Sequence, residues 1–300
     1  MMKPIINPYA ALAIGVITVS ASAIFVKLSH SPSGVIAFYR LLFSVLFMLP
    51  LFLAKYTKEL KRITKRDWLF TTISGVLLAF HFILWFESLN YTSVASSTVL
   101  VTLQPLFAFI GAYFFFKEKI TIGAVISGVI AIIGSFIISW GDFQISGTAL
   151  FGDILALIAC AFITGYLLFG QTVRQRLSLI TYTFLVYSIS TITLFMYIVF
   201  KGEPLIPEVK LDWFYFILLA IFPTLLGHSL FNWVVKWLST TTISMAILLE
   251  PVGATIMAYY ILNETVTWSQ IVGGIVVIFG LSLFIIDERK LRLKNPSSPL

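Results

Sequence analysis

The side chains of this chain that could do chemistry are ionisable groups inside long apolar runs, and Glu250 is the clearest of them. Glu250 lies near the middle of the apolar run 240–262 and precedes Pro251. A charge at the centre of a bilayer costs about 2.5–3.5 kcal/mol on insertion scales, so it usually faces a cavity or a partner. Glu250 could contact a substrate amine or carry a proton. Alternatively, it stays protonated and hydrogen-bonds a neighbouring helix.

An internal repeat provides a counterpart for Glu250. Residues 93–134 align without a gap with residues 239–280, at an offset of 146 residues, and this pairs Gln104–Pro105 with Glu250–Pro251. Proline removes a backbone hydrogen bond and bends a helix, so both copies place a polar side chain beside a predicted kink. We expect the kinks at Pro105 and Pro251 to shape one cavity, in which only the glutamate copy can titrate.

Arg40 is a second ionisable group inside an apolar run. It lies about 10 Å into the second run, at the level predicted for Glu87 and Lys27. Arg40 could hold an anionic group such as a carboxylate. The other interpretation, which we prefer, is an ion pair between Arg40 and Glu87 that closes an outer vestibule, with Lys27 extending to water.

Polar side chains recur at helical spacing in two further runs. His81, Trp85 and Ser88 share one face of the third run, and Thr224, His228 and Asn232 share one face of the eighth. If these helices line a cavity, each face supplies polar groups to it, and the first also supplies an aromatic wall. A histidine inside a membrane more often bonds a neighbouring helix than relays protons, so both interpretations stand for each histidine.

No arrangement typical of an enzyme occurs in the sequence. It has no nucleophile with a base and an orienting group, no glycine-rich phosphate loop and no metal-ligand spacing. The single cysteine, Cys160, excludes an intrachain disulfide, and three unclustered histidines argue against zinc. We therefore predict no catalytic residue, no metal, no cofactor and no ATP hydrolysis by this chain alone.

Composition indicates a membrane protein. The chain is 59% hydrophobic and 11% charged, with a mean hydropathy of +0.99, which is far more apolar than a soluble domain. Its net charge of +7 could suggest nucleic-acid binding, but the basic residues lie in short segments between apolar runs, where they indicate topology. The sequence therefore predicts an all-α integral membrane protein that does not bind nucleic acid.

Ten apolar runs are long enough to cross the hydrocarbon core, which takes about 20 residues. They are residues 7–28, 34–54, 68–89, 93–116, 121–140, 147–170, 181–200, 212–233, 240–262 and 267–287. The first run is too long for a signal peptide and continues past a small-residue stretch at 20–23, so we expect a retained helix. Most connections are short, which makes successive helices antiparallel neighbours.

Ten transmembrane helices divide into two repeats of five, residues 1–144 and 145–288, followed by a disordered tail at 289–300. An odd number of helices per repeat inserts the second copy upside down relative to the first. With the N-terminus inside, the basic loop at 55–67 and the basic tail also lie inside, which is typical of cytoplasmic segments. We predict a multi-pass protein of the plasma or inner membrane with both termini cytoplasmic.

Glycines recur in the fifth and tenth runs, where small residues allow helices to approach closely. They are Gly123, Gly128, Gly134, Gly273, Gly274 and Gly280. We expect them to pack the two runs together within one chain. The alternative is a contact between copies, so the protein is expected to be a monomer or a homodimer.

The chain also carries a distinctive set of short motifs. These are Phe38-Tyr39-Arg40, the turn SLNYTSVA at 88–95, the paired mid-run prolines, and Glu-x-x-Thr at 118–121 and 264–267. Together they resemble the drug/metabolite transporter superfamily, EamA type, over essentially the whole chain. The resemblance implies a bacterial inner-membrane carrier with two EamA repeats, from a group that includes exporters of amino acids and related metabolites.

The predicted function is alternating-access transport, in which two inverted repeats rock about a cavity at the membrane midplane. The solute would be a small organic metabolite, with an amino acid or a related compound preferred and export implied by the resemblance. The candidate substrate-binding or coupling residues are Glu250, Gln104, His81, Trp85, Arg40, His228 and Asn232. Proton coupling, facilitated diffusion and exchange all stay open. An exporter of drugs or hydrophobic cations is the main alternative, and a membrane scaffold without transport is the other.

Overall fold

The computed structural model describes residues 4, 6–92, 94–117, 120–138, 140, 147–263 and 265–294, with the backbone alone at 95, 288, 289 and 291–294. Every regular element within this part of the chain is helical, as predicted. The elements are α1 (Pro8–Ser20), α2 (Ser22–Leu28), α3 (Ser33–Lys55), the 3₁₀ helix η1 (Thr57–Arg62), α4 (Lys65–Ser88), α5 (Val94–Val101), α6 (Gln104–Phe116), α7 (Ile122–Ile138), α8 (Gly147–Arg174), α9 (Leu179–Lys201), α10 (Asp212–Leu219), the π-helix η2 (Ala220–His228), α11 (Ser229–Val234), α12 (Thr240–Ile247), α13 (Glu250–Ile261) and α14 (Trp268–Lys294).

Nine apolar segments in the described part of the chain are long enough to cross a membrane. A further apolar helix, α7, has 17 residues and is shorter than a typical span. The positions of these segments correspond to those of the predicted runs.

Several helix boundaries differ from those predicted, and α8, for example, continues to Arg174 rather than ending at residue 170. α4 begins at Lys65 rather than at residue 68, because Thr64 and Asp67 form a capping box at its start. α14 continues to Lys294, into the segment predicted as a disordered tail from residue 289. Residues 295–300 of the predicted tail lie outside the described residues.

The predicted kinks at Pro105 and Pro251 are complete breaks. In each copy one helix ends, at Val101 or Ile247, and a new helix begins one residue before the proline. Proline then sits in the first turn of α6 or α13, where its missing N–H would have no partner in any case.

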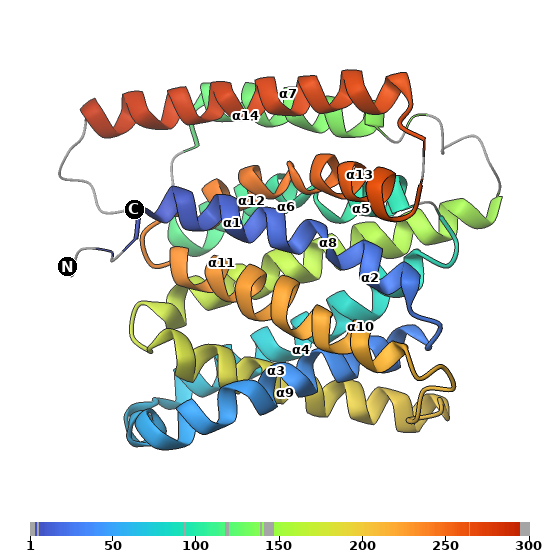
Figure 1. Cartoon of the computed structure of the whole chain (residues 1–300). Helices are drawn as coiled ribbons and strands as arrows, with labels where there is room; N and C mark the ends of the chain where they lie inside the picture. The colour runs from blue at the N-terminus through green and yellow to red at the C-terminus, as the bar shows by residue number, and fades with distance from the viewer. Residues whose placement is uncertain are drawn as a thin grey trace.

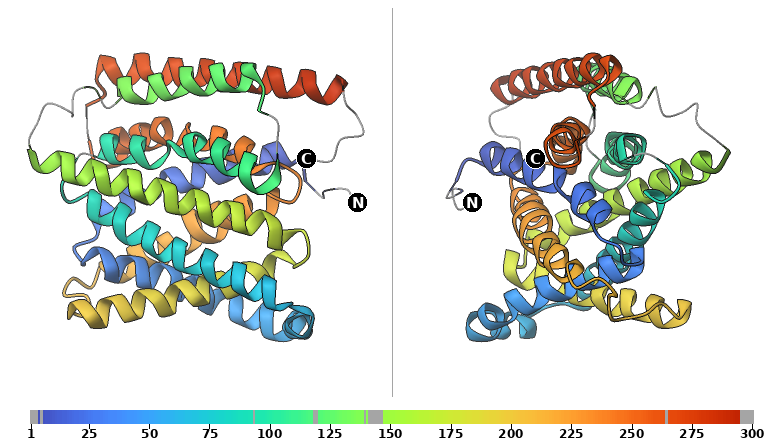
Figure 2. Two further views of the ribbon diagram at one scale, coloured as in Figure 1. Left: turned by 180° about the vertical axis from the view of Figure 1, so that it is seen from behind. Right: turned by 45° about the vertical axis from the view of Figure 1, so that its right-hand side comes forward.

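The helices form layers that run in roughly one direction (Figure 1). α7 and α14 pair along their length and make an outer layer, at the top of Figure 1, beside α5, α6, α12 and α13. α4 packs on both α8 and α9, and α3 packs on α9 at the opposite side of the molecule (Figure 2). The largest apolar core lies in this second region and includes side chains of α1, α3, α4, α8 and α9.

The α7–α14 pair depends on glycine. A Cβ added at Gly134, Gly273 or Gly280 would come within 2.7 Å of a backbone atom of the other helix. The two helices therefore touch backbone to backbone, which confirms the predicted packing within one chain for these three positions. The remaining three glycines, Gly123, Gly128 and Gly274, face side chains instead.

Adjacent glycines on α14 provide a matched test of this contact. Gly273→Ala should lower the melting temperature in detergent, because the new methyl group would lie 2.5 Å from the Gly134 carbonyl oxygen, and overpacking costs about 1–3 kcal/mol. Gly274→Ala should leave stability unchanged or slightly raised, since its nearest neighbour would be a Val252 methyl group at 3.6 Å. Equal melting temperatures for the two variants would contradict the close backbone contact.

Candidate functional site

A cavity of about 20 Å³ lies between six of the apolar segments. Each half of the chain contributes six of its lining residues. They are Val19, Ser22, His81, Trp85, Val101 and Gln104 from the first half and Ile163, Leu167, His228, Phe231, Ile247 and Glu250 from the second. The first, third and fourth segments of each half supply them, so the cavity draws equally on the two copies of the repeat.

The helix breaks bring Gln104 and Glu250 to this cavity. Gln104 is the first residue of α6 and Glu250 the first residue of α13, and both side chains are buried. The proline that follows each of them cannot donate a hydrogen bond to the carbonyl group four residues earlier. That carbonyl group belongs to Val101 in the first copy and to Ile247 in the second, and both residues line the cavity. The cavity is therefore bordered by two helix N-termini, which carry partial positive charge.

Arg40 is fully buried beside the cavity. Its Nε donates to Thr224 Oγ1 at 2.7 Å, its Nη1 donates to Ser22 Oγ at 2.8 Å, and its Cζ lies 4.1 Å from the centroid of the Phe82 ring. Its Nη2 has no hydrogen-bond partner. Arg40 interacts electrostatically with Glu250, although these two described residues form no direct ion pair.

The predicted ion pair between Arg40 and Glu87 is wrong. The Glu87 carboxylate accepts long hydrogen bonds from Asn90 Nδ2 and the Tyr91 hydroxyl, at 3.4 Å each. Phe82 and Phe86 of α4 both face Arg40. Successive residues of an α-helix point about 100° apart, so Glu87, which follows Phe86, points away from that face.

Lys27 has a more specific contact than the predicted extension to water. Its ammonium group donates to the Leu89 carbonyl oxygen at 2.7 Å, at the C-terminal end of α4. A cation is favourable there because the last carbonyl groups of a helix lack partners within the helix.

Thr224, which bonds Arg40, belongs to the π-helix η2. Pro223 lies inside η2 and cannot donate to the Leu219 carbonyl oxygen. The Thr224 hydroxyl takes that place, donating to the Leu219 oxygen at 2.8 Å, and its oxygen accepts from Arg40 Nε. The Thr224 hydroxyl therefore links the guanidinium group to the backbone of the π-helix.

His81 and Trp85 form the predicted aromatic wall. Both line the cavity, and their ring centroids are 5.7 Å apart at an interplanar angle of 24°. His81 Nδ1 lies 3.0 Å from the Ala159 carbonyl oxygen, which can only accept, so Nδ1 carries the proton and Nε2 is left as an acceptor. Ser88 does not join them, since its hydroxyl lies 2.6 Å from that of Ser97.

Thr224, His228 and Asn232 were predicted to share one helical face, but they do not all reach the cavity. The wider turn of η2 changes the spacing between Thr224 and His228. His228 lines the cavity, while Thr224 bonds Arg40. Asn232 is not a lining residue. Its Nδ2 donates to the Tyr166 hydroxyl and to the His228 carbonyl oxygen, which makes it a link between α8 and α11.

Unpartnered polar atoms gather around the cavity. Trp85 Nε1, Gln104 Oε1 and His228 Nδ1 belong to lining residues and are buried without a hydrogen-bond partner. Nη2 of Arg40, whose Nη1 bonds the lining residue Ser22, also has no partner. Buried polar groups in proteins nearly always have partners, so three such atoms on the cavity lining, with a fourth on Arg40 beside them, form a candidate site for a polar ligand. The described residues contain no group of His, Cys, Asp and Glu that could hold a metal ion.

Two parts of the site were missed in the sequence. Ser22 belongs to the small-residue stretch considered only as a cleavage signal, although a serine in an apolar run is also a possible ligand for a buried cation. Phe82 adjoins His81 but belongs to the face that meets Arg40. In the sequence, Pro223 was the available signal that the eighth run departs from regular α-helical geometry, as it does in η2.

The chain was compared with known proteins. The EamA-like transporter family matches it twice, at residues 7–140 and 150–286. An uncharacterised transporter, YxxF, of Bacillus subtilis is 26% identical over 280 residues, covering 93% of this chain and 89% of the relative. An uncharacterised transporter of Archaeoglobus fulgidus is 25% identical over 284 residues, covering 91% of this chain and 95% of the relative.

A solved structure has the same fold. A crystal structure of a protein, at 15% sequence identity, superposes with a TM-score of 0.75 and covers 94% of this chain and 99% of that one. The two family matches together span most of the chain and take in all of the cavity-lining residues. This chain therefore belongs to the EamA-like transporter family.

Proposed function

We propose that the protein carries a small polar organic solute, an amino acid or a related metabolite, across the cell membrane by alternating access. The unpartnered polar atoms around the cavity support this proposal most directly. A buried polar group without a partner costs roughly 1–3 kcal/mol, so the site favours a solute that brings both donors and acceptors.

The charges at the site favour a solute that carries a carboxylate and an amine. Glu250 would accept from the amine. Arg40 Nη2 and the N-terminus of α6 would donate to the carboxylate, since both present N–H groups to negative charge. The stacked rings of His81 and Trp85 would contact the apolar part of the solute.

The size of the cavity fits one step of a transport cycle. A volume of about 20 Å³ holds roughly one water molecule, so helices must move apart to admit an organic solute. Ten transmembrane helices in two inverted repeats, with both termini in the cytoplasm, would allow the same movement toward either side of the membrane.

Export of drugs or hydrophobic cations is the second candidate. Glu250 and the aromatic wall are suitable for a cation, because a carboxylate and ring faces both attract positive charge. The buried Arg40 opposes this reading, since a cation beside Glu250 would also lie near a guanidinium group. Thermal stabilisation of the purified protein by a panel of amino acids, amines and lipophilic cations would separate the two candidates.

Glu250 is expected to couple transport to protons, because it is the carboxylate at the cavity and its counterpart is Gln104. Glu250→Gln should keep at least part of substrate binding, abolish accumulation driven by a pH gradient in proteoliposomes, and still permit exchange. Gln104→Ala, at the counterpart position, should weaken binding without removing the response to the pH gradient. Unchanged accumulation by Glu250→Gln, at equal protein level, would contradict proton coupling through this residue.

Arg40 is expected to select for the carboxylate. Arg40→Lys should weaken binding of an amino acid at least tenfold, because lysine lacks the planar fork that reaches Thr224, Ser22 and the solute together. Binding of the corresponding amino-acid amide, which has no carboxylate, should change much less. Measured by calorimetry, equal losses for the acid and its amide would show that Arg40 only supports the fold. Ser44→Ala, also buried on α3, is the control.

Topology can be tested with single cysteines in a Cys160→Ala background. Lys61→Cys and Glu208→Cys replace exposed residues of the two longer loops. An impermeant thiol reagent added to intact cells should label Glu208→Cys and leave Lys61→Cys unmodified until the membrane is permeabilised. Labelling of Lys61→Cys in intact cells would overturn the predicted orientation.

A further inference from the structure

Two ion pairs occur among the described residues, and they lie at opposite ends of the helices. Asp212 lies 3.6 Å from His30, and Asp67 lies 3.6 Å from Arg176. The first pair is at the end where α2 turns into α3, on the right of Figure 1, and the second is at the end where α8 turns into α9. Each pair joins the first half of the chain to the second.

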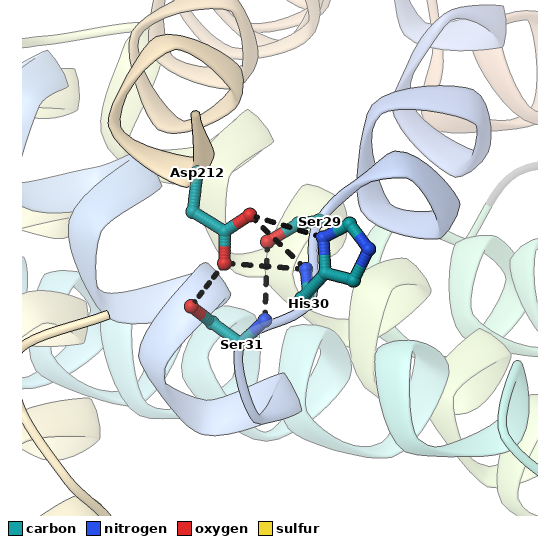
Figure 3. Close-up of polar contacts among 4 residues, drawn as sticks. All are labelled: Ser29, His30, Ser31 and Asp212. Carbon is teal, nitrogen blue, oxygen red and sulfur yellow. Dashed lines mark hydrogen bonds and ion pairs between the residues drawn. The ribbon is translucent and has the colours of Figure 1, made fainter. Parts of the chain in front are cut away.

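The Asp212 contact holds the turn between α2 and α3 (Figure 3). The carboxylate is buried at the start of α10 and accepts a hydrogen bond from the Ser31 hydroxyl at 2.6 Å. It also accepts from the His30 backbone N–H, at 3.1 and 3.2 Å to its two oxygens, while the His30 side chain is 68% exposed. We call this group the His30 clasp.

The Asp67 contact joins the turn between α8 and α9 through the Arg176 side chain alone. Asp67 is buried in the first turn of α4, where one oxygen accepts from Thr64 and faces Arg176, whose side chain is 55% exposed. We call this group the Arg176 clasp.

Glu59 reinforces the Arg176 clasp. From η1 it accepts hydrogen bonds from the Ser178 N–H at 2.7 Å and from the hydroxyl groups of Ser178 and Thr181 at the start of α9. Partial burial would raise the pKa of the Glu59 carboxyl, but these hydrogen bonds outweigh that effect, and the pKa lies below its usual value.

The two clasps occupy equivalent places in the repeat. His30 and Arg176 each stand two residues before the N-cap of the second helix of their half, Pro32 or Ser178. The two aspartates each stand in the first turn of the third helix of the other half, within Lys-x-Asp-Trp at 65–68 and at 210–213. In each clasp, a basic residue of one half contacts the aspartate of the other half. Duplication of the repeat accounts for both clasps only because both contacts form between the halves.

We propose that the His30 and Arg176 clasps are the two gate contacts of the transport cycle, each of which must open to expose the cavity on its own side. The inference rests on the proposed carrier function. Both clasps are closed in this structure, which agrees with a cavity too small for an organic solute. Because the clasps join the two halves at opposite ends, movement of the halves that opens one end leaves the other clasp closed.

The two clasps differ in strength. Arginine is always charged, whereas histidine is charged only when protonated, and only the Arg176 clasp has a second carboxylate in Glu59. The cycle should therefore open more readily at the His30 end.

Accessibility of a cavity cysteine can test the clasps. Val101→Cys in the Cys160→Ala background places a thiol at the cavity, and an impermeant thiol reagent is applied to intact cells or to inverted vesicles. Glu208→Cys and Lys61→Cys identify which side each preparation exposes, so the test does not depend on absolute orientation. Glu208 shares the loop that leads to Asp212, and Lys61 lies in η1 beside Glu59.

Asp212→Ala should raise the labelling rate from the Glu208 side about tenfold and lower it from the Lys61 side, while Asp67→Ala should do the reverse. His30→Arg, which gives the weaker clasp a permanent charge, should slow labelling from the Glu208 side about threefold. Glu208→Gln removes an exposed carboxylate from the same loop and should change neither rate. If an aspartate variant does not fold, Ser31→Ala and Thr181→Val each remove one hydrogen bond to a carboxylate of the clasp, Asp212 or Glu59, and should give smaller shifts in the same directions.

Labelling that is unchanged, or that rises from both sides in either aspartate variant, would overturn the proposal, since general loosening has no sidedness. Solute flux in proteoliposomes, measured without the reporter cysteine, separates this inference from the proposed function. If the two aspartate variants shift labelling in opposite directions but no solute flux is detected, the result would support the clasps as gate contacts and contradict the proposed carrier function. Flux in the wild type without shifts in labelling would contradict the clasps alone.

Discussion

Proline inside apolar helices is the constraint on which the rest of this structure depends. In hydrocarbon every backbone polar group needs a partner within the protein, so a helix can break only where the freed groups face the interior. Pro105 and Pro251 break two helices at the cavity, and Pro223 opens η2 beside it. The position of these three prolines therefore determines where polar groups can gather, and the remaining helices pack around that place.

Arg40 illustrates what the burial of a charged group among these helices requires. A guanidinium group is costly inside a membrane unless hydrogen bonds compensate for lost hydration. Thr224 and Ser22 provide two acceptors and Phe82 provides a ring face. Glu250 interacts electrostatically with Arg40 without forming an ion pair. Nη2 of the guanidinium group keeps no hydrogen-bond partner, so compensation within the protein is incomplete.

The sequence predicts the fold well because each helix signal is local. Apolar length, the gapless repeat and the glycine positions locate the segments and the α7–α14 contact without any knowledge of tertiary structure. Gln104, Glu250, His81 and Trp85 were found at the cavity because proline breaks and α-helical spacing are also local signals. The Arg40–Glu87 pair was wrong because it was inferred from depth in the membrane alone, whereas the face of α4 that meets Arg40 follows from packing between distant segments. Asn232, which α-helical spacing predicted at the cavity, instead bonds the Tyr166 hydroxyl.

The duplicated halves keep symmetry at the ends of the molecule and lose it at the centre. His30 with Asp212 and Arg176 with Asp67 repeat the same contact at the same distance, whereas Gln104 replaces Glu250, and Arg40 occupies only one copy. Such a division is physically consistent with a carrier, because opening toward either side requires similar mechanical contacts, while one solute with distinct charged ends requires an asymmetric site. The symmetry of the clasps and the asymmetry of the cavity thus have separate causes within one repeated fold.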